Sequence, residues 1–86
     1  METSEVQRLI EAGLPGAKVT VTGDGSHFDA VVISPAFEGK SLLAQQKMVL
    51  ATVAGHITSG ALHALSIKAY TPEKWAQASK LKVGPA

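Results

Sequence analysis

The fold is decided by the stretch KVTVTGDGSHFDAVVIS at residues 18–34. Apolar and polar side chains alternate over residues 18–22, which is typical of a strand with one buried face. The Gly-Asp-Gly-Ser segment at residues 23–26 predicts a turn, because glycine and aspartate tolerate the backbone conformations that tight turns require. Residues 27–34 are rich in β-branched side chains and predict a second strand. Since the turn is short, the two strands should form an antiparallel hairpin.

A long helix and a third strand follow the hairpin. Ser41 is a candidate N-cap for a helix that should end near residues 59–60. Apolar side chains recur near helical spacing within it and predict a buried stripe formed by Leu42, Val49, Val53 and Ile57. Residues 65–69 alternate again and predict a third strand. Because a long helix joins the second strand to the third, these two strands should be parallel, with a right-handed connection.

Two shorter helices are predicted at the ends of the chain. Residues 4–7, Ser-Glu-Val-Gln, fit a capping box at the start of the first helix, which the Gly and Pro residues at 13–16 should end. Residues 71–73, Thr-Pro-Glu, give the last helix its cap, its first position and a first-turn acid. From about Ser79 the tail should be flexible. The order is αββαβα, so we expect one α+β domain over residues 1–86, with a three-stranded mixed sheet and the helices on one face.

Composition narrows the classes of function. The 86 residues are 45% hydrophobic and 17% charged, as in an ordinary globular domain. The formal net charge is +1, which argues against nucleic-acid binding driven mainly by phosphate neutralisation. The chain contains no cysteine, which excludes disulfides, thiolate nucleophiles and any metal site built from its own thiolates. No apolar run approaches the roughly 20 residues of a membrane span, and no targeting segment is visible, so we expect a soluble cytoplasmic protein without membrane association.

Two histidines lie at the predicted ends of neighbouring strands. His27 begins the second strand, and His63 lies just before the third. If these strands are parallel, both histidines lie at the same edge of the sheet, where neutral imidazoles could bind iron, zinc or copper. Two ligands do not complete a site, because structural zinc takes four, so another molecule would have to supply the rest. The alternative, that each is an ordinary surface residue, stays open, and His56 on the long helix is interpreted as one.

No arrangement of side chains predicts catalysis. Asp24, Ser26 and His27 are hydrolase side chains by type, but they are crowded into one turn, where a proton relay is unfavourable. The Gly-Asp-Gly segment is too short for a phosphate-binding fingerprint and leads into a strand, not a helix. Phe28 and Trp75 are interpreted as packing residues. We therefore do not expect an enzyme.

Three motifs resemble one protein family. They are GDGSHF at residues 23–28, FEGKS at residues 37–41 and HALSIKAYTPEKW at residues 63–75. Together they are similar to the BolA family, most of all to its IbaG-type bacterial branch, and the resemblance extends from Val6 to about Trp75. It implies a fold similar to a class II KH domain, in agreement with the element order above.

The resemblance also implies a partner and a cofactor. Proteins of this family pair with monothiol glutaredoxins, and a [2Fe–2S] cluster is bridged between the two. The glutaredoxin supplies a cysteine, glutathione supplies a second thiolate, and the BolA-like partner supplies the His that opens the third motif, here His63. A His or Cys from the loop between the first two strands is a further ligand, here His27. That loop consists of Gly23, Asp24, Gly25 and Ser26.

The ligand set implied by the resemblance has chemical consequences. Imidazole in place of thiolate should raise the potential of the cluster. Because His must be neutral to bind, the cluster should bind more weakly at acidic pH. The implied role is iron–sulfur cluster trafficking or the sensing of iron, redox state or stress.

A nucleic-acid-binding transcriptional regulator is the alternative function. Its candidate phosphate contacts on the KH-like surface are Lys40, Lys47, Lys68 and Lys74. Residues 44–47 read AQQK, as in the IbaG-like branch, where some BolA proteins carry an Arg-His-Arg-like segment, which argues against carrying over the DNA-binding role of those proteins. The Gly-x-x-Gly loop that clamps nucleic-acid backbones in KH domains is also missing, since only Gly39 lies nearby. An interaction module without metal and a homodimer both stay open.

Overall fold

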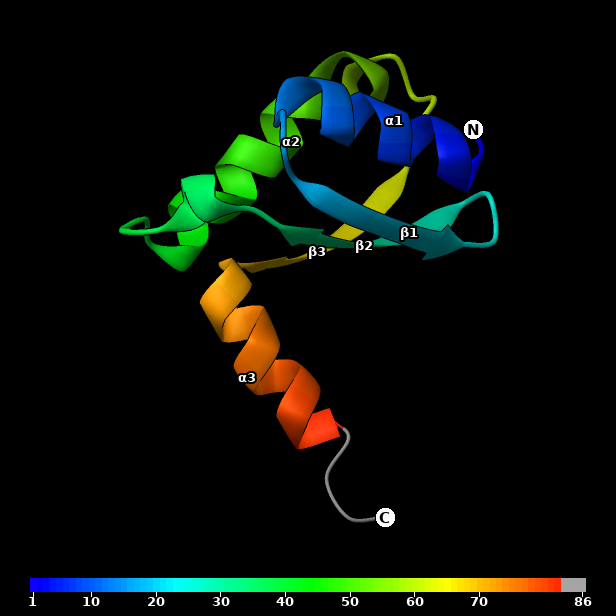
Figure 1. Ribbon diagram of the computed structural model, residues 1–86. Coiled ribbons are helices and arrows are strands. Elements are labelled where there is room, and N and C mark those ends of the chain that lie inside the picture. Colours follow the sequence, from blue (N-terminus) through cyan, green and yellow to red (C-terminus); the bar gives the residue numbers. More distant parts are fainter. Residues whose placement is uncertain (83–86) are drawn as a thin grey trace.

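The order of helices and strands follows the prediction. The computed structural model of the protein describes residues 1–82 (Figure 1). The elements along this part of the chain are α1 (Thr3–Gly13), β1 (Lys18–Gly23), β2 (His27–Ile33), the 3-10 turn η1 (Pro35–Phe37), α2 (Leu42–Thr58), β3 (Ala64–Tyr70) and α3 (Pro72–Lys82). The αββαβα order is confirmed, with η1 as an addition. Residues 83–86, part of the tail predicted to be flexible, lie outside the described residues, and α3 remains helical through Lys82.

The three strands form one mixed sheet in the order β1–β2–β3. β1 pairs antiparallel with β2, from Lys18 opposite Ile33 to Gly23 opposite Phe28. β2 pairs parallel with β3, and His27 lies opposite Ala64 where both strands start. α2 makes the long crossover that a parallel pair needs. The predicted α+β class and the mixed sheet are therefore confirmed.

α1 and α2 cover one face of the sheet and leave the other face open (Figure 1). Alternation along β2 decides which side chains meet the helices. Phe28, Ala30 and Val32 are buried, whereas His27 and Asp29 are exposed. The other buried apolar residues of the core are Val6, Ile10, Val19, Val21, Phe37, Val49, Val53, Leu62 and Ile67. The alternate positions of β2 face the open side: they are the exposed His27 and Asp29 at its start and the half-buried Val31 and Ile33 toward its end.

α3 does not join this helical layer. It follows β3 after Thr71 and extends away from the end of the sheet (Figure 1). None of the side chains of residues 72–79 is buried, so little apolar surface holds this helix against the sheet. Its first turn is attached through Trp75, which packs edge-on against Tyr70 with ring centroids 5.2 Å apart. The helices that lie on one face are thus α1 and α2, and α3 stands apart.

The buried stripe of α2 is shorter than predicted. Val49 and Val53 are fully buried, but Leu42 and Ile57 are 72% and 40% exposed, so their predicted burial is wrong. Leu42 lies on the same side of the helix as Val49. It is exposed because it is the first residue of α2, where the helix extends past the core. Each step of four residues turns about 40° around a helix, so Ile57 has rotated about 80° from Val49. None of the helices within residues 1–82, α2 included, is long and apolar enough to cross a membrane.

α1 begins earlier than its predicted capping box. Ser4 lies inside the first turn, and Glu2 is the residue that precedes the helix. The backbone N–H of Glu2 donates a hydrogen bond to Oε1 of Glu5 at 3.2 Å, which satisfies a donor that the helix itself leaves free. The predicted position of the cap is therefore wrong by two residues, because Glu2 takes the place assigned to a hydroxyl.

Gln45 is a buried polar residue that hydropathy did not predict. Its side chain is 4% exposed, and its Nε2 donates hydrogen bonds to the carbonyl oxygens of Phe37 at 3.2 Å and Lys40 at 3.0 Å. These bonds attach η1 and the loop after it to α2. The neighbouring Gln46 donates from Nε2 to the carbonyl oxygen of Ile67 at 2.9 Å and so attaches α2 to β3. Gln45 and Gln46 of the AQQK segment therefore both form hydrogen bonds that hold α2 to its neighbours.

Replacing Gln45 with Met should lower the free energy of unfolding by about 1–3 kcal/mol, because two hydrogen bonds of a buried side chain are lost and the Phe37 carbonyl oxygen keeps only the bond from the N–H of Lys40. Met preserves the length of the side chain, so the loss of packing should be small. Urea unfolding followed by circular dichroism measures the change. The exposed Gln77→Met on α3 is the control and should change the free energy by less than about 0.5 kcal/mol. Equal free energies for Gln45→Met and wild type would contradict a structural role for these hydrogen bonds.

Candidate functional site

The starts of β2 and β3 form one rim of the sheet, and both predicted ligands lie there. His27 is the first residue of β2 and pairs in register with Ala64, the first residue of β3; His63 directly precedes Ala64. The spacing of neighbouring strands and the rise per residue place the Cα atoms of His27 and His63 about 6 Å apart. The parallel pairing thus brings together two histidines that are far apart in the sequence. Their role as ligands stays a prediction.

Both histidines are exposed at this rim. The His27 side chain exposes 79% of its surface and projects, like that of Asp29, from the open face of the sheet. His63 is also exposed and lies just outside β3, where strand alternation no longer fixes the direction of its side chain. Imidazoles that solvent reaches freely can also be reached by a second molecule.

The loop before His27 depends on two glycines. A Cβ at Gly23 would collide with the carbonyl oxygen of His27 and would lie 2.9 Å from a ring carbon of Phe28. Gly25 has φ +98°, in the left-handed region that residues with a Cβ rarely adopt. Glycine at these positions allows the two arms of the hairpin to approach closely and the chain to reverse. The loop thereby sets the place at which His27 enters β2.

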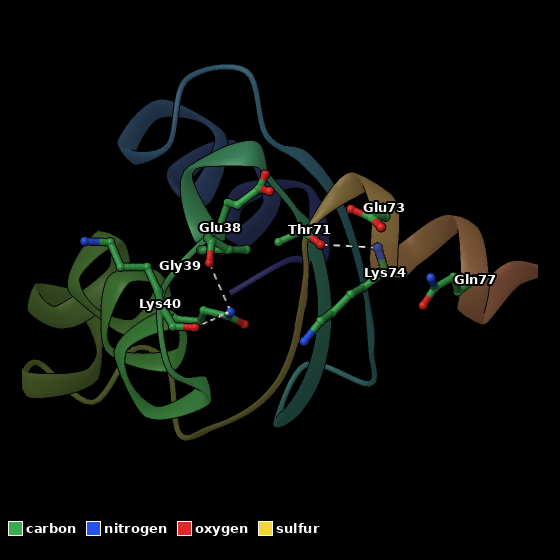
Figure 2. Close-up of a pocket in the computed structure, with 9 residues that line it drawn as sticks. Glu38, Gly39, Lys40, Thr71, Glu73, Lys74 and Gln77 are labelled. Carbon is green, nitrogen blue, oxygen red and sulfur yellow. Dashed lines mark hydrogen bonds between the residues drawn. The ribbon is translucent and has the colours of Figure 1, made fainter.

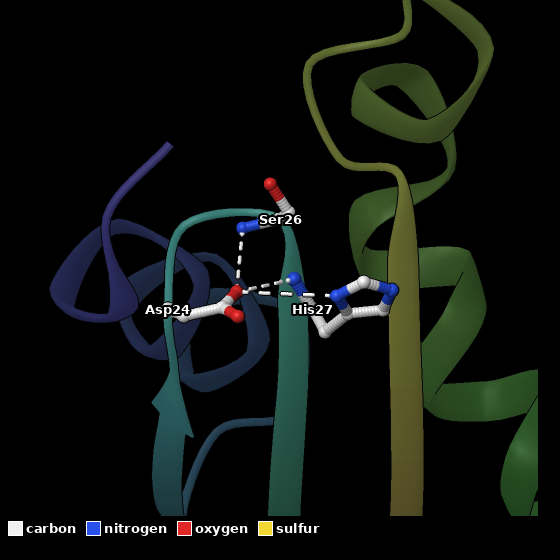
Figure 3. Close-up of polar contacts among 3 residues, drawn as sticks. All are labelled: Asp24, Ser26 and His27. Atoms are coloured by element: carbon white, nitrogen blue, oxygen red, sulfur yellow. Dashed lines mark hydrogen bonds and ion pairs between the residues drawn. The ribbon is translucent and has the colours of Figure 1, made fainter.

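Asp24 organises the same loop (Figure 3). Its Oδ1 accepts hydrogen bonds from the backbone N–H groups of Ser26 at 3.0 Å and His27 at 2.9 Å. The same Oδ1 lies 4.0 Å from Nδ1 of His27. The backbone hydrogen bonds from His27 and Ser26 lower the pKa of the Asp24 carboxyl, because they stabilise its ionised form. Asp24 therefore fixes the backbone around His27 and places a negative charge near its ring.

The two histidines at the rim do not make a closed metal site. Among the residues that the structure describes, no three His, Cys, Asp or Glu side chains gather closely enough to hold an ion. Two imidazoles are half of a four-ligand set. A metal group bound at the rim would therefore need further ligands from another molecule.

His56, interpreted from the sequence as a helix-surface residue, lines a surface groove. It lies in the last turn of α2, is half-buried, and lines a groove together with Arg8 and Leu9 of α1. Its carbonyl oxygen accepts a hydrogen bond from the N–H of Leu62 at 3.0 Å, in the connection to β3. Sequence periodicity missed this environment because the groove forms only where α1 packs on α2.

Two of the candidate phosphate-binding lysines share a groove between the loop after η1 and the start of α3 (Figure 2). Lys40 and Lys74 line this groove, but Glu38 and Glu73 line it as well. In Figure 2 the side chain of Lys74 extends from α3 toward the loop after η1. The side chain of Lys40, which belongs to that loop, points away from α3. The two carboxylates offset the two ammonium groups, so the groove lacks the strongly positive potential that would attract a phosphate backbone.

The other two lysines lie outside this groove. Lys47 is exposed on α2, in the helical layer, whereas Lys68 is exposed on β3 and projects from the open face. These two side chains therefore belong to different sides of the sheet. The four lysines together do not line one groove.

Comparison with known proteins gives matches along nearly the whole chain. A family model described as BolA-like protein matches residues 8–74. The chain is 40% identical over 81 residues to the acid stress protein IbaG of Escherichia coli strain K12, and the match covers 94% of this chain and 96% of that protein.

Solved structures share the fold. A BolA protein homologue from Coxiella burnetii superposes with a TM-score of 0.80 at 39% identity, covering 88% of this chain and 97% of that chain. The BolA domain of SufE1 from Arabidopsis thaliana superposes with a TM-score of 0.72 at 28% identity, covering 84% and 93% of the two chains. This chain and these proteins therefore share one fold, which in this chain consists of three helices and a mixed three-stranded sheet.

The carboxyl of Asp24 should titrate below its ordinary pKa of 3.8, because two backbone N–H groups stabilise the carboxylate. A pKa that is lower in the folded state stabilises the fold at neutral pH, and this contribution is lost as the pH falls through the folded-state pKa. Carboxyl carbon NMR over an acid titration measures the midpoint, and Asp24→Asn identifies the resonance. A midpoint at or above 3.8 would contradict the expectation.

Proposed function

This chain belongs to the BolA-like protein family, and we propose that it is a non-catalytic partner of a monothiol glutaredoxin, with which it shares a bridging [2Fe–2S] cluster. The observation that carries the proposal is the rim of the sheet, where the parallel register of β2 and β3 makes His27 and His63 neighbours. The role we propose is iron–sulfur cluster trafficking or the sensing of iron, redox state or stress.

The chemistry of the donors supports a shared group. His27 and His63 would supply imidazole nitrogens, and the chain has no cysteine of its own. The cysteine of the glutaredoxin and the thiolate of glutathione would complete the ligand set. A neutral imidazole carries less negative charge than a thiolate, so a cluster held by this mixed set would have a higher reduction potential than one held by thiolates alone.

The surroundings of the rim leave it accessible to a partner. α1 and α2 pack on the covered face of the sheet, whereas His27 projects from the open face (Figure 1). α3 leaves from the end of β3, which is opposite to the end where His63 lies. A second protein can therefore approach both histidines without displacing a helix.

The nucleic-acid alternative has weaker support. Lys40 and Lys74 share their groove with two carboxylates, and the net charge of the chain is only +1. Gln45 and Gln46, in the segment where some family members carry basic residues, donate hydrogen bonds to backbone carbonyl oxygens. Neither feature favours a phosphate-binding surface.

Replacing His63 with Ala should abolish the spectrum of the shared cluster, and His27→Ala should alter it, because each change removes one proposed ligand. The protein is mixed with a monothiol glutaredoxin, glutathione, iron and sulfide, and visible absorption and circular dichroism are recorded. His56→Ala removes an imidazole from the groove between α1 and α2 and serves as the control, which should leave the spectrum unchanged.

A spectrum that stays that of the glutaredoxin homodimer for wild type and every variant would overturn the proposal. Salt-dependent DNA binding by the isolated protein, lost in Lys40→Ala and Lys74→Ala, would then favour the alternative function. Unchanged glutaredoxin binding without a cluster, whatever residues occupy positions 27 and 63, would favour an interaction module without metal.

Cluster binding should weaken between about pH 8 and about pH 5, because protons compete with the metal for imidazole nitrogens. The decay of the heterodimer spectrum over this range measures the effect. The glutaredoxin homodimer, with thiolate ligands alone, is the comparison and should lose less of its spectrum. Identical pH profiles for the two complexes would contradict imidazole ligation.

A further inference from the structure

We propose that Asp24 is a positioning residue for His27: its carboxylate draws the ring proton to Nδ1 and leaves Nε2 unprotonated on the side of the ring that faces β3. The role of Nε2 as a ligand rests on the function proposed above. The tautomer itself is a property of the free protein and can be measured without a cluster.

The position of the carboxylate is fixed by the backbone of its own loop. Oδ1 of Asp24 accepts hydrogen bonds from the N–H groups of Ser26 and His27 at 3.0 and 2.9 Å. The N–H of Asp24 donates to the carbonyl oxygen of His27 at 3.2 Å. Left-handed Gly25 lies between the bonded residues and allows the tight reversal. The carboxylate is therefore held at one place relative to the Cα atom of His27.

The ring of His27 turns its Nδ1 toward this carboxylate. The distance from Nδ1 to Oδ1 of Asp24 is 4.0 Å, which is too long for a hydrogen bond but within the range of electrostatic attraction. A proton on Nδ1 directs the positive end of the N–H dipole at the carboxylate, whereas a lone pair there would face a negative charge. The carboxylate therefore favours the tautomer with its proton on Nδ1.

The second ring nitrogen is directed away from Asp24 and toward β3 (Figure 3). Ala64, the first residue of β3, lies in register with His27, and His63 comes directly before it. The lone pair on Nε2 therefore lies on the side of the ring where the other proposed ligand is found. Carboxylates act in this way on many metal-bound histidines, by orienting the ring from the nitrogen that does not touch the metal.

The size of the effect depends on water at the rim. The side chains of His27 and Asp24 are 79% and 73% exposed, so water screens their attraction. In the free protein we expect Asp24 to change the tautomer ratio of His27 by about twofold to fivefold. A partner docked on the rim would displace this water, and the lower local dielectric would strengthen the same attraction.

Asp29 offers a matched control on the same strand. It lies two residues after His27 on β2, so its side chain projects from the same open face, about 7 Å further along. Within residues 1–82 it forms no hydrogen bond or ion pair with His27, whose ion-pair partner is Asp24. Asp29→Asn removes the same charge as Asp24→Asn without touching the loop.

Nitrogen NMR of the free protein tests the proposal. At about pH 8, where histidine side chains are mostly neutral, two-bond proton–nitrogen correlations show which ring nitrogen carries the proton. We expect a larger Nδ1-protonated fraction at His27 than at His63. Asp24→Asn should shift the ratio at His27 about twofold to fivefold toward Nε2 protonation, because the amide is uncharged but keeps an oxygen for the loop N–H groups. Asp29→Asn should leave the ratio unchanged.

An equal tautomer ratio in wild type and Asp24→Asn would overturn the proposal, as would an equal shift in Asp29→Asn. Asp24→Asn could disturb the loop, which large changes in the backbone amide shifts of Ser26 and His27 would reveal. In that case the comparison of His27 with His63 in the wild-type protein decides. Nδ1 protonation at His27 no greater than at His63 then overturns it.

Cluster assembly with the glutaredoxin provides the second measurement. Asp24→Asn should reduce the yield of the heterodimer spectrum at least about twofold, in line with the tautomer shift, whereas Asp29→Asn should not. An unchanged yield in Asp24→Asn would overturn the positioning role. Failure of the wild-type protein to form any shared cluster would overturn the proposed function, and the tautomer measurement would stand independently of it.

Discussion

The parallel pairing of β2 with β3 is the interaction on which the candidate site depends. Because the two strands run in the same direction, their starts share one rim, and His27 and His63 become neighbours. An antiparallel pair with a tight connection would have placed these residues differently, since it joins the end of one strand to the start of the next. A parallel pair needs a long crossover, and α2 supplies it. The same helix contributes Val49 and Val53 to the core, so one element makes the connection and stabilises the sheet that it connects.

Because side chains alternate along a strand, the packing that stabilises β2 also decides on which face of the sheet His27 lies. Phe28 and Val32 of β2 point into the core, and His27 and Asp29 therefore point to the open face. A shift of β2 by one residue would bury His27 and expose Phe28, which the loss of apolar burial strongly disfavours. The contacts that hold β2 in register thus also hold the imidazole of His27 on the exposed side of the sheet.

Local sequence patterns predicted the strands and two of the helix caps, although the cap of α1 was predicted two residues too late. The strands followed from alternation, and the caps Ser41 and Thr71 accept the N–H hydrogen bonds expected of them. Features that arise only when elements pack together were missed. The carbonyl oxygens that bond to Gln45 belong to η1 and the loop before α2, which fold back against the helix, and the groove around His56 needs α1. For the site, topology predicted that His27 and His63 share a rim. The approach of the Asp24 carboxylate to the ring of His27 depends on turn geometry, which residue types alone do not specify.

A metal group shared between two molecules places a different demand on its ligands than a resident metal does. The ligands must stay reachable by the partner, so burial cannot fix their positions. In this chain, for which we propose such a shared group, hydrogen bonds within the loop at residues 23–26 take the place of burial, since they hold the backbone of His27 while its side chain stays exposed. Exposure also leaves the imidazoles open to protons and water until a partner covers them. The affinity of such a site and its response to acid are therefore determined by how the partner covers the rim as much as by the residues that this chain contributes.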